Sequence, residues 1–239
     1  MLNHKKKTVG IIGGMGPAAT SLLFQKLIND TEAATDAEHM HILIDNNPAI
    51  PDRTAAILRG EHTPADHIVE SGKKLEACGA ELLLIPCNTS HYFYDEIQSR
   101  LQVPVVNMIA ETAEVCRKQG YKKVGVLATT GTCSTHTYDR ELEKAGIEAV
   151  YPDEEGQQKV MEIIYDQVKA GKKINAMILD QTLKKMNAEG AEAFILGCTE
   201  LPFAIKNGDF GYHFMDSLDI LAKRTVELAG YPLKGKKEC

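Results

Sequence analysis

The sequence contains no tryptophan, few aromatic residues and no long uncharged apolar run. Trp is absent from the 239 residues and Phe, Trp and Tyr together make up 6%, which excludes an interface built on tryptophan anchors. Charges or glycines interrupt every apolar stretch before the roughly 18 residues that a membrane span requires. Lys and Arg number 27 against 33 Asp and Glu, giving a net charge of −6. Because non-specific nucleic-acid affinity comes from clustered Lys and Arg, we expect neither a nucleic acid nor a membrane as partner.

The remaining composition is that of an ordinary globular protein. Hydrophobic residues make up 44% and charged residues 25%, which excludes an intrinsically disordered chain. The length allows one large domain or two small ones. Six cysteines are too few for a disulfide scaffold in a chain of this size. Gly10, Gly13 and Gly14 break the apolar stretch after the N-terminal lysines too early for a signal peptide, so we expect a reducing, cytoplasmic location.

Short β-branched runs alternate with longer helical patterns. Each run is too short and too apolar to be half exposed, which is typical of strands covered on both faces. The predicted strands span 8–12, 41–45, 81–85, 103–106, 123–127, 148–151 and 193–196. Helices are predicted to begin at Pro17 and Thr63 and to cover 153–171 and 175–190. This alternation predicts an α/β fold with mainly parallel sheets.

The second half of the chain repeats features of the first. A strand followed by a Gly- or Thr-rich loop begins near Thr8 and again near Lys122. Gly-Ala-Glu, an apolar run and a cysteine follow at similar offsets, at 79–87 and 190–198. Two related α/β halves facing each other would place these two cysteines on opposite walls of one cleft.

Cys87 and Cys198 each follow the C-terminal end of an apolar strand, where ligands bind in open α/β sheets. The residues after both can start a helix, whose free N–H groups favour a thiolate. Two thiols on opposite sides of a small molecule can invert a tetrahedral carbon, because one takes a proton from one face while the other returns a proton to the opposite face. A disulfide oxidoreductase fits less well, since neither cysteine lies in a Cys-x-x-Cys motif. A zinc site would need two ligands besides Cys87 and His91.

Four motifs spread over nearly the whole chain carry a family resemblance. They are Gly-Gly-Met-Gly-Pro at 13–17, Asn-Pro-Ala-Ile-Pro-Asp-Arg-Thr at 47–54, Pro-Cys-Asn-Thr-Ser-His at 86–91 and Leu-Gly-Cys-Thr-Glu-Leu-Pro at 196–202. Through these motifs the sequence resembles the aspartate/glutamate racemase family, and within it the aspartate racemase branch. The glutamate racemase branch usually has Asp-Ser-Gly in the first loop and His after the second Cys-Thr. This chain has Gly13-Gly14-Met15 and Glu200 at those places.

The resemblance implies two pseudo-symmetric three-layer α/β domains, with mainly parallel four-stranded sheets and the active site in the cleft between them. The N-terminal domain would comprise 1–106 and 213–239, the latter containing a returning helix near 216–230, and the second domain would comprise 107–212. It also implies racemisation by the cysteine pair with no cofactor, that is without pyridoxal phosphate, metal or nucleotide, in a homodimer. The first Gly-rich loop does not complete a dinucleotide fingerprint, because Ala19 stands where a third glycine is expected.

Cations and loop groups are expected to bind the substrate's carboxylates. Arg53 lies in a proline-bounded loop, and its planar fork suits a carboxylate. By resemblance Lys169 corresponds to an active-site lysine, although the sequence alone does not distinguish it from two lysines nearby. Hydroxyls and amides of the threonine-rich loop at 129–132 would bind the second carboxylate, with Thr130 as the chosen residue, or would form only a turn and cap.

The loops next to the cysteines supply the other expected substrate contacts. The residues assigned to substrate binding there are Met15, Asn88, Thr89, Ser90, Thr199 and Glu200. Glu200 would accept the substrate ammonium or cap its own helix. His91 is assigned no chemistry. Four cysteines lack the strand–Cys–Thr context and are predicted to be structural, namely Cys78, Cys116, Cys133 and Cys239.

The sequence therefore predicts a cytoplasmic, cofactor-independent racemase that interconverts L- and D-aspartate through a thiol/thiolate pair, with a small acidic amino acid as its partner. One alternative is another enzyme of this architecture, such as a glutamate or broad-specificity amino-acid racemase, or a decarboxylase or isomerase of a small dicarboxylate. The other is a non-catalytic protein that binds an acidic amino acid. Tight binding without proton exchange would favour the last.

Overall fold

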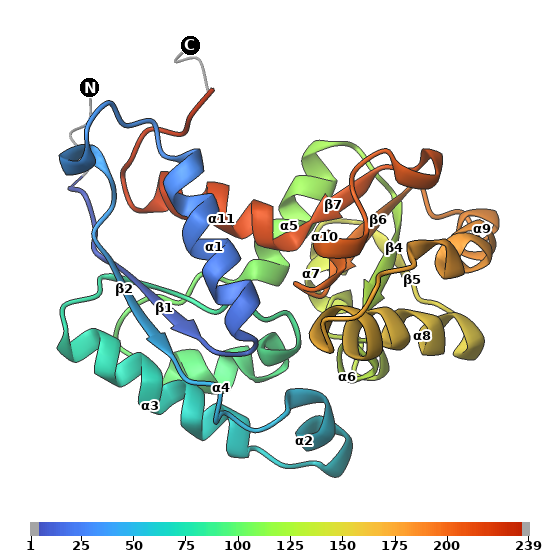
Figure 1. Cartoon of the computed structure of the whole chain (residues 1–239), viewed down its shortest axis with the longest axis horizontal. Coiled ribbons are helices and arrows are strands. Elements are labelled where there is room, and N and C mark those ends of the chain that lie inside the picture. Colours follow the sequence, from blue (N-terminus) through green and yellow to red (C-terminus); the bar gives the residue numbers. More distant parts are fainter. Residues whose placement is uncertain (1–4, 236–239) are drawn as a thin grey trace.

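Two parallel β-sheets, each covered by helices, lie side by side (Figure 1). This computed structural model describes residues 5–235. The first sheet has the order β2-β1-β3, and the second has the order β5-β4-β6-β7. The strands are β1 Val9–Gly13, β2 Ile42–Asn46, β3 Leu82–Leu84, β4 Lys123–Ala128, β5 Glu148–Val150, β6 Ala193–Gly197 and β7 Phe214–Asp216. The predicted α/β class with parallel sheets is confirmed.

The sheets differ from the prediction at two short segments. Residues 103–106 were predicted to form a strand, but only one parallel bridge, between Leu83 and Val105, joins them to β3. Pro104 in the middle of this run has no N–H to extend a ladder, so the first sheet has three described strands rather than four. Conversely, β7 pairs with β6 in the second sheet, and its three residues are too few to show a strand periodicity.

Alternating side chains of each sheet pack against helices on opposite faces, which gives three layers in each half. In the first sheet Ile12 faces α3 Thr63–Ala77 and α4 Tyr94–Ser99, whereas Ile11 faces α1 Pro17–Asp30 and α11 Ser217–Leu228. In the second sheet Leu127 faces α8 Glu154–Met161 and α9 Asp180–Ala188, whereas Val126 faces α5 Met108–Lys118 and α7 Asp139–Lys144.

Shorter helices occupy the loops after the strands. They are α2 Arg53–Arg59, α6 Thr130–Ser134 and α10 Leu201–Ala204, the 3-10 turns η1 Asp36–Glu38, η2 Thr89–Phe93, η4 Ala176–Leu179 and η5 Asp209–Gly211, and the π-helix η3 Glu162–Lys169. The predicted helices at 153–171 and 175–190 are confirmed as α8 with η3 and as η4 with α9.

The C-terminal helix α11 lies against both α1 and α5 (Figure 1). It therefore contacts helices from both halves of the chain. The division at 106/107 and 212/213 stays a prediction, and β7 lies in the second sheet although the prediction grouped it with the N-terminal domain.

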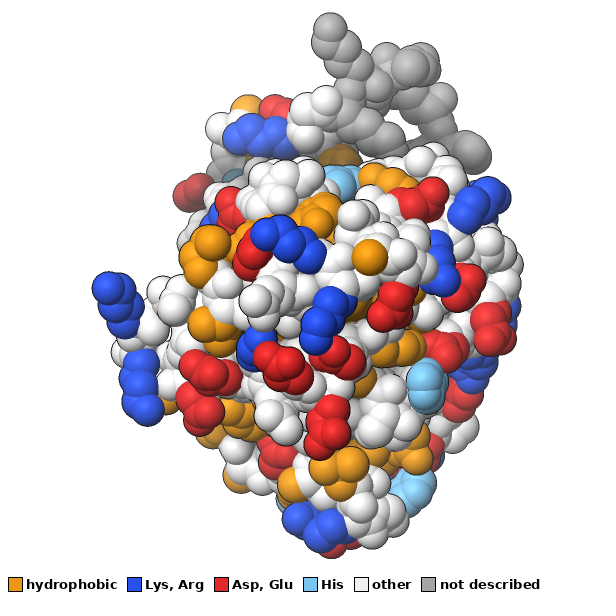
Figure 2. Space-filling view, turned by 90° about the vertical axis from the view of Figure 1, so that its right-hand side faces the viewer, with side chains coloured by type: hydrophobic (Ala, Val, Ile, Leu, Met, Phe, Trp, Pro, Cys, Tyr) orange, Lys and Arg blue, Asp and Glu red, His pale blue; other side chains and the backbone are white. Residues whose placement is uncertain are grey.

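The described surface carries mixed charge. On the face shown in Figure 2, basic and acidic side chains lie interspersed, with small apolar areas between them. Between residues 5 and 235 no helix has both the length and the apolar character needed to cross a membrane.

Candidate active site

The carboxyl ends of four strands meet around a small cavity between the two halves. β1 and β3 are neighbours in the first sheet, and β4 and β6 are neighbours in the second. The loops after these strands line the cavity together with the start of α2 and the π-helix η3. The lining residues are Met15, Asp52, Arg53, Thr54, Cys87, Asn88, Thr89, Thr129, Tyr165, Lys169, Cys198, Thr199 and Glu200. Each half thus supplies one cysteine to the same cavity.

This cavity is narrow and well shielded. It leaves about 10 Å³ for the centres of water molecules, which is the space of a single water. Cys87 and Cys198 are each 6% exposed. An amino acid can therefore enter only when the two walls or their side chains move apart.

The loop that carries Cys87 is held by His91, whose ring is buried. The Met108 amide donates to Nε2 of His91 (3.1 Å), so the other ring nitrogen must carry the proton. Nδ1 accordingly donates to the Cys87 carbonyl oxygen (2.9 Å). Burial lowers the pKa of His91, so the ring stays neutral. It joins the Cys87 loop to the start of α5, which agrees with assigning it no chemistry.

Arg53 is the cation on the Cys87 wall. Asp52 caps α2 by accepting from the Ala55 amide (2.8 Å), which places Arg53 in the first turn. The guanidinium is 9% exposed and donates to the carbonyl oxygens of Ile50 (3.2 Å), Pro51 (3.0 Å) and Met15 (3.3 Å), while its buried Nε has no partner among the described residues. Burial lowers the pKa of Arg53, but the nearby Cys87 sulfur and Asp52 carboxylate raise it above its ordinary value.

The Cys198 wall carries an acidic side chain, Glu200, where the Cys87 wall carries the cation Arg53. The Cys198 thiol donates to Oε2 of Glu200 (3.0 Å), and the Thr199 hydroxyl donates to the same oxygen (3.2 Å). Lys169 Nζ lies 3.9 Å from Oε1. Burial raises the pKa of Cys198 well above its ordinary value, the Glu200 carboxylate raises it further, and Lys169 opposes this shift.

Tyr165 and Lys169 project from the π-helix η3, a helix type that is frequent at functional sites. Lys169 Nζ lies 4.1 Å from the centroid of the Tyr165 ring. The Tyr165 hydroxyl donates to Oδ2 of Asp52 (3.1 Å) and so connects the two halves. Nearby, α2 faces α6 (Figure 1), and a Cβ on Gly131 would come within 3.0 Å of the Thr54 Cα. The two walls are therefore in contact at the mouth of the cavity.

Comparison with known proteins identifies the family. Residues 12–225 match the Asp/Glu/Hydantoin racemase family. The chain belongs to this family. The broad specificity amino-acid racemase RacX of Bacillus subtilis is 30% identical over 230 residues, covering 91% of this chain and 96% of that protein. The aspartate racemase of Picrophilus torridus has a TM-score of 0.81 and 34% identity, covering 95% and 96%. An aspartate racemase homologue from Pyrococcus horikoshii has a TM-score of 0.76 and 32% identity, covering 93% and 99%. The protein is an isomerase of the racemase type.

The racemase has one threonine placed differently from the prediction. Thr130 does not line the cavity but lies in a second pocket, where its hydroxyl accepts from Gln157 Nε2 (3.4 Å). Thr129 occupies the cavity wall instead, because it caps α6 and its hydroxyl turns back toward the Thr132 amide. The Thr129 hydroxyl is 2.9 Å from that of Thr89 in the other half, so this pair spans the cavity floor.

Three other residues of the prediction have partners within the protein. Both side-chain groups of Asn88 are occupied, because Oδ1 accepts from Tyr138 (2.6 Å) and Nδ2 donates to Ser217 (3.0 Å). Ser90 is buried, does not line the cavity and donates to Sδ of Met15 (3.4 Å). The side chain of Glu200 makes no cap hydrogen bond to α10, so the expectation that it caps its own helix is wrong.

Four lining residues were not selected from the sequence, namely Asp52, Thr54, Thr129 and Tyr165. Asp52 and Thr54 flank Arg53, and Tyr165 precedes Lys169 by one helical turn. Adjacency to an assigned residue is the signal that would have found these three.

The three other cysteines that the structure describes have no comparable setting. Burial raises the pKa of Cys116 to about 12 and that of Cys133 to about 12, which makes both thiols unreactive. Cys78 is exposed and lines none of the pockets described above. Cys239 lies outside the described residues. Within 5–235, no group of three or more His, Cys, Asp or Glu residues is arranged to hold a metal ion.

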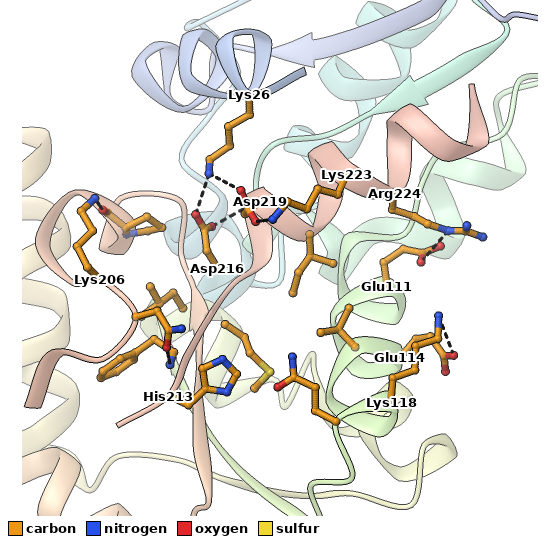
Figure 3. Close-up of a pocket in the computed structure, with 18 of the residues that line it drawn as sticks. Lys26, Glu111, Glu114, Lys118, Lys206, His213, Asp216, Asp219, Lys223 and Arg224 are labelled. Atoms are coloured by element: carbon orange, nitrogen blue, oxygen red, sulfur yellow. Dashed lines mark hydrogen bonds and ion pairs between the residues drawn. The ribbon is translucent and has the colours of Figure 1, made fainter. Parts of the chain in front are cut away.

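A larger cavity of about 550 Å³ lies behind the active site, between α1, α5, β7 and α11 (Figure 3). Lys26 of α1 crosses it to reach Asp216 (3.3 Å) and Asp219 (2.8 Å). Arg224 pairs with Glu111 across the same space (3.1 Å). These charged groups are thus paired with one another, and none of the described residues that line this cavity is a cysteine, so the smaller cavity is the better candidate for chemistry.

We expect Tyr165→Phe to raise KM for the substrate by about fivefold, because the hydrogen bond to Asp52 contributes roughly 1 kcal/mol. Steady-state kinetics on both enantiomers would measure this. The thermal midpoint should change little, since the ring is retained. An unchanged KM would show that the Tyr165–Asp52 contact plays no part in holding the walls together.

Proposed function

We propose that the protein interconverts L- and D-aspartate by a two-base mechanism, without pyridoxal phosphate, and that Cys87 and Cys198 are the two bases. The observation that carries this proposal is the placement of one cysteine from each half on the same shielded cavity. Cys87 follows the carboxyl end of β3, and Cys198 follows the carboxyl end of β6.

The reaction needs no reagent beyond the two thiols and the substrate. One cysteine, as thiolate, removes the α-proton from one face and becomes a thiol. The electron pair of the broken C–H bond delocalises into the α-carboxylate. The opposing thiol then donates its proton to the other face and becomes a thiolate. The reverse reaction uses the same steps with the roles exchanged.

Two cations support the binding of a dicarboxylate. Arg53 carries a buried Nε–H without a partner among the described residues, and a substrate carboxylate oxygen would satisfy it. Lys169 is 29% exposed at its side chain and lies on the opposite wall. Placed near the α-carboxylate, either cation would stabilise the negative charge that develops as the proton leaves.

The relatives support aspartate as the substrate, and they also name the alternative, a broad substrate specificity. The aspartate racemase of Picrophilus torridus resembles the chain over nearly its full length, as does the broad-specificity racemase RacX. We therefore test aspartate, glutamate, asparagine, alanine and lysine as substrates. A preference of at least tenfold in kcat/KM for aspartate supports the proposed specificity. Comparable values across the panel would assign a broad-specificity racemase instead. The homodimer and the cytoplasmic location stay predictions.

The mechanism is tested with the native protein in D2O, starting from each pure enantiomer. The product should contain α-deuterium, while recovered substrate should remain largely protiated at low conversion, because different groups take and return the proton. Activity should persist after dialysis against EDTA and in the presence of hydroxylamine, which traps pyridoxal phosphate. Rapid deuteration of the substrate pool at the same rate as the product would contradict the two-base mechanism. Tight aspartate binding without any exchange would assign a binding protein.

A further inference from the structure

The two active-site thiols lie in oppositely charged surroundings. Cys87 faces the Arg53 guanidinium, whose positive charge interacts with the Cys87 sulfur. Cys198 instead touches the Glu200 carboxylate, with 3.0 Å between Sγ and Oε2. Both residues are 6% exposed, and they differ in the charge of their neighbours, a guanidinium beside Cys87 and a carboxylate beside Cys198.

We propose that Glu200 holds the proton on Cys198 in the resting enzyme, which makes Cys198 the first acid of the pair and leaves Cys87 to act first as the base. Glu200 is then a positioning residue that acts through Cys198. This inference rests on the proposed function, since it assigns the starting roles of its two bases.

The contact with Glu200 requires a proton between sulfur and oxygen, because a thiolate and a carboxylate at this distance would repel each other. The surroundings place that proton on sulfur. The Thr199 hydroxyl also donates to Oε2 (3.2 Å), and Lys169 Nζ lies 3.9 Å from Oε1. In both interactions the Glu200 carboxylate is the acceptor or the anion. An ionised carboxylate can only accept, so the Cys198 thiol is the donor.

Charged and titratable groups near Cys198 come from both halves. Those on or facing the cavity are Glu200 from its own loop, Lys169 and Tyr165 from η3, Tyr138 at the start of α7, and Cys87, Asp52 and Arg53 from the other half. Burial and Glu200 raise the pKa of Cys198, whereas Lys169 lowers it. Lys169 also interacts with Glu200 and Cys87. Arg53 is the cation of the first half whose charge interacts with Cys87.

The arrangement has a defined effect on pH dependence. The competent free enzyme has one thiolate and one thiol, so activity rises as the first thiol of the pair ionises and falls as the second ionises. Glu200 disfavours a thiolate at Cys198 and therefore moves the second ionisation to higher pH. Removing its charge should move the alkaline limb of kcat/KM to lower pH and leave the acid limb in place.

The first test uses alkylation of the full-length native protein by iodoacetamide, followed by peptide mapping, with no substrate present. At neutral pH we expect Cys87 to react at least about tenfold faster than Cys198, because only the thiolate is nucleophilic. Glu200→Gln should increase the rate at Cys198 by about tenfold, which corresponds to one pH unit, and leave Cys87 unchanged. Exposed Cys78 serves as the internal reference. Equal rates at the two cysteines in the native protein, or an unchanged Cys198 rate in the variant, would overturn the inference.

The second test is the pH profile of kcat/KM, with Thr199→Val as the matched control. That variant removes a neutral hydrogen bond to the same Glu200 oxygen but no charge. Glu200→Gln should move the alkaline limb down by about one unit, whereas Thr199→Val should move it much less, even if it lowers kcat. Glu200→Asp, which keeps the charge, should restore the native profile in part. A loss of activity in Glu200→Gln with both limbs unmoved would assign it a merely structural role.

The two proposals can fail separately. Alkylation is independent of turnover, so the expected alkylation pattern in a protein that racemises no amino acid would contradict only the proposed function. Racemisation with deuterium in the product, but with equally reactive cysteines, would contradict only the role of Glu200.

Discussion

Cys87→Ser and Cys198→Ser will each reduce racemisation by roughly 10³-fold or more. A serine hydroxyl is a much weaker acid than a thiol, so it can neither form the base nor return a proton at useful rates, and general acid–base groups typically contribute 10²–10⁴-fold. The substitution replaces one sulfur atom by oxygen in a side chain that is 6% exposed and lines a cavity, so the packing around it changes little. The expected loss is therefore in kcat and not in folding.

The two variants should differ from each other in α-hydrogen exchange. Each retains one thiol, which can still remove the α-proton of the enantiomer that faces it and return a deuteron to the same face. We therefore expect each variant to exchange one enantiomer only, and the two variants to choose opposite enantiomers. Exchange is followed by NMR or mass spectrometry in D2O on each pure enantiomer. Racemisation at native rates by both variants would refute the two-base scheme, and Cys116→Ser serves as a cysteine control outside the cavity.

Arg53→Met will lower kcat/KM for aspartate by about 10³-fold, since loss of one partner of a buried charged interaction costs roughly 2–5 kcal/mol. The substitution removes the cation beside Cys87 and the only guanidinium on the cavity wall among the described residues. Both the binding of a carboxylate and the stabilisation of the Cys87 thiolate should suffer. Steady-state kinetics and the alkylation rate of Cys87 measure these two effects separately.

Two controls separate the chemistry of Arg53 from its contacts with the loop. Arg53→Lys keeps the charge but loses the planar fork, so it should recover part of the activity. Circular dichroism and thermal unfolding would show whether losing the bonds to the Ile50, Pro51 and Met15 carbonyls unfolds the loop. If Arg53 binds the distal carboxylate, Arg53→Met should reduce turnover of aspartate more than that of asparagine. An equal loss for both would assign it to the α-carboxylate or to Cys87.

Strong local patterns made most of the fold predictable. Apolar runs with flanking turn residues located six of the seven strands between residues 5 and 235, and N-terminal prolines located the starts of α1 and α3. The errors fall where local pattern and tertiary pairing disagree. Residues 103–106 have the composition of a strand but contain Pro104 and form one bridge. β7 is short and forms its ladder with β6, a pairing that no local sequence pattern predicts.

The site residues that could be predicted from the sequence are those that lie in one of the four family motifs. Cys87, Cys198, Arg53 and Met15 belong to such motifs and all line the cavity. The sequence could not show that Thr129 rather than Thr130 lines the cavity, because this depends on which hydroxyl turns inward at the cap of α6. The partners of Asn88 and Glu200 could not be read from the sequence either, since they depend on side-chain directions across the two halves.

The hydrogen bonds around Asn88 bear on how the racemase admits its substrate. This amide lies next to Cys87 and receives the Tyr138 hydroxyl, while Ser217 links it to the Leu196 carbonyl (2.8 Å), two residues before Cys198. Each of these bonds is buried, so separating the halves at this depth would leave several polar groups unsatisfied. The hydrogen bond from Tyr165 to Asp52, which also joins the halves, is by contrast exposed. We therefore expect the cavity to open by a hinge motion of the two halves about these buried hydrogen bonds. Such a motion would admit an amino acid while the backbone next to each sulfur stays in place.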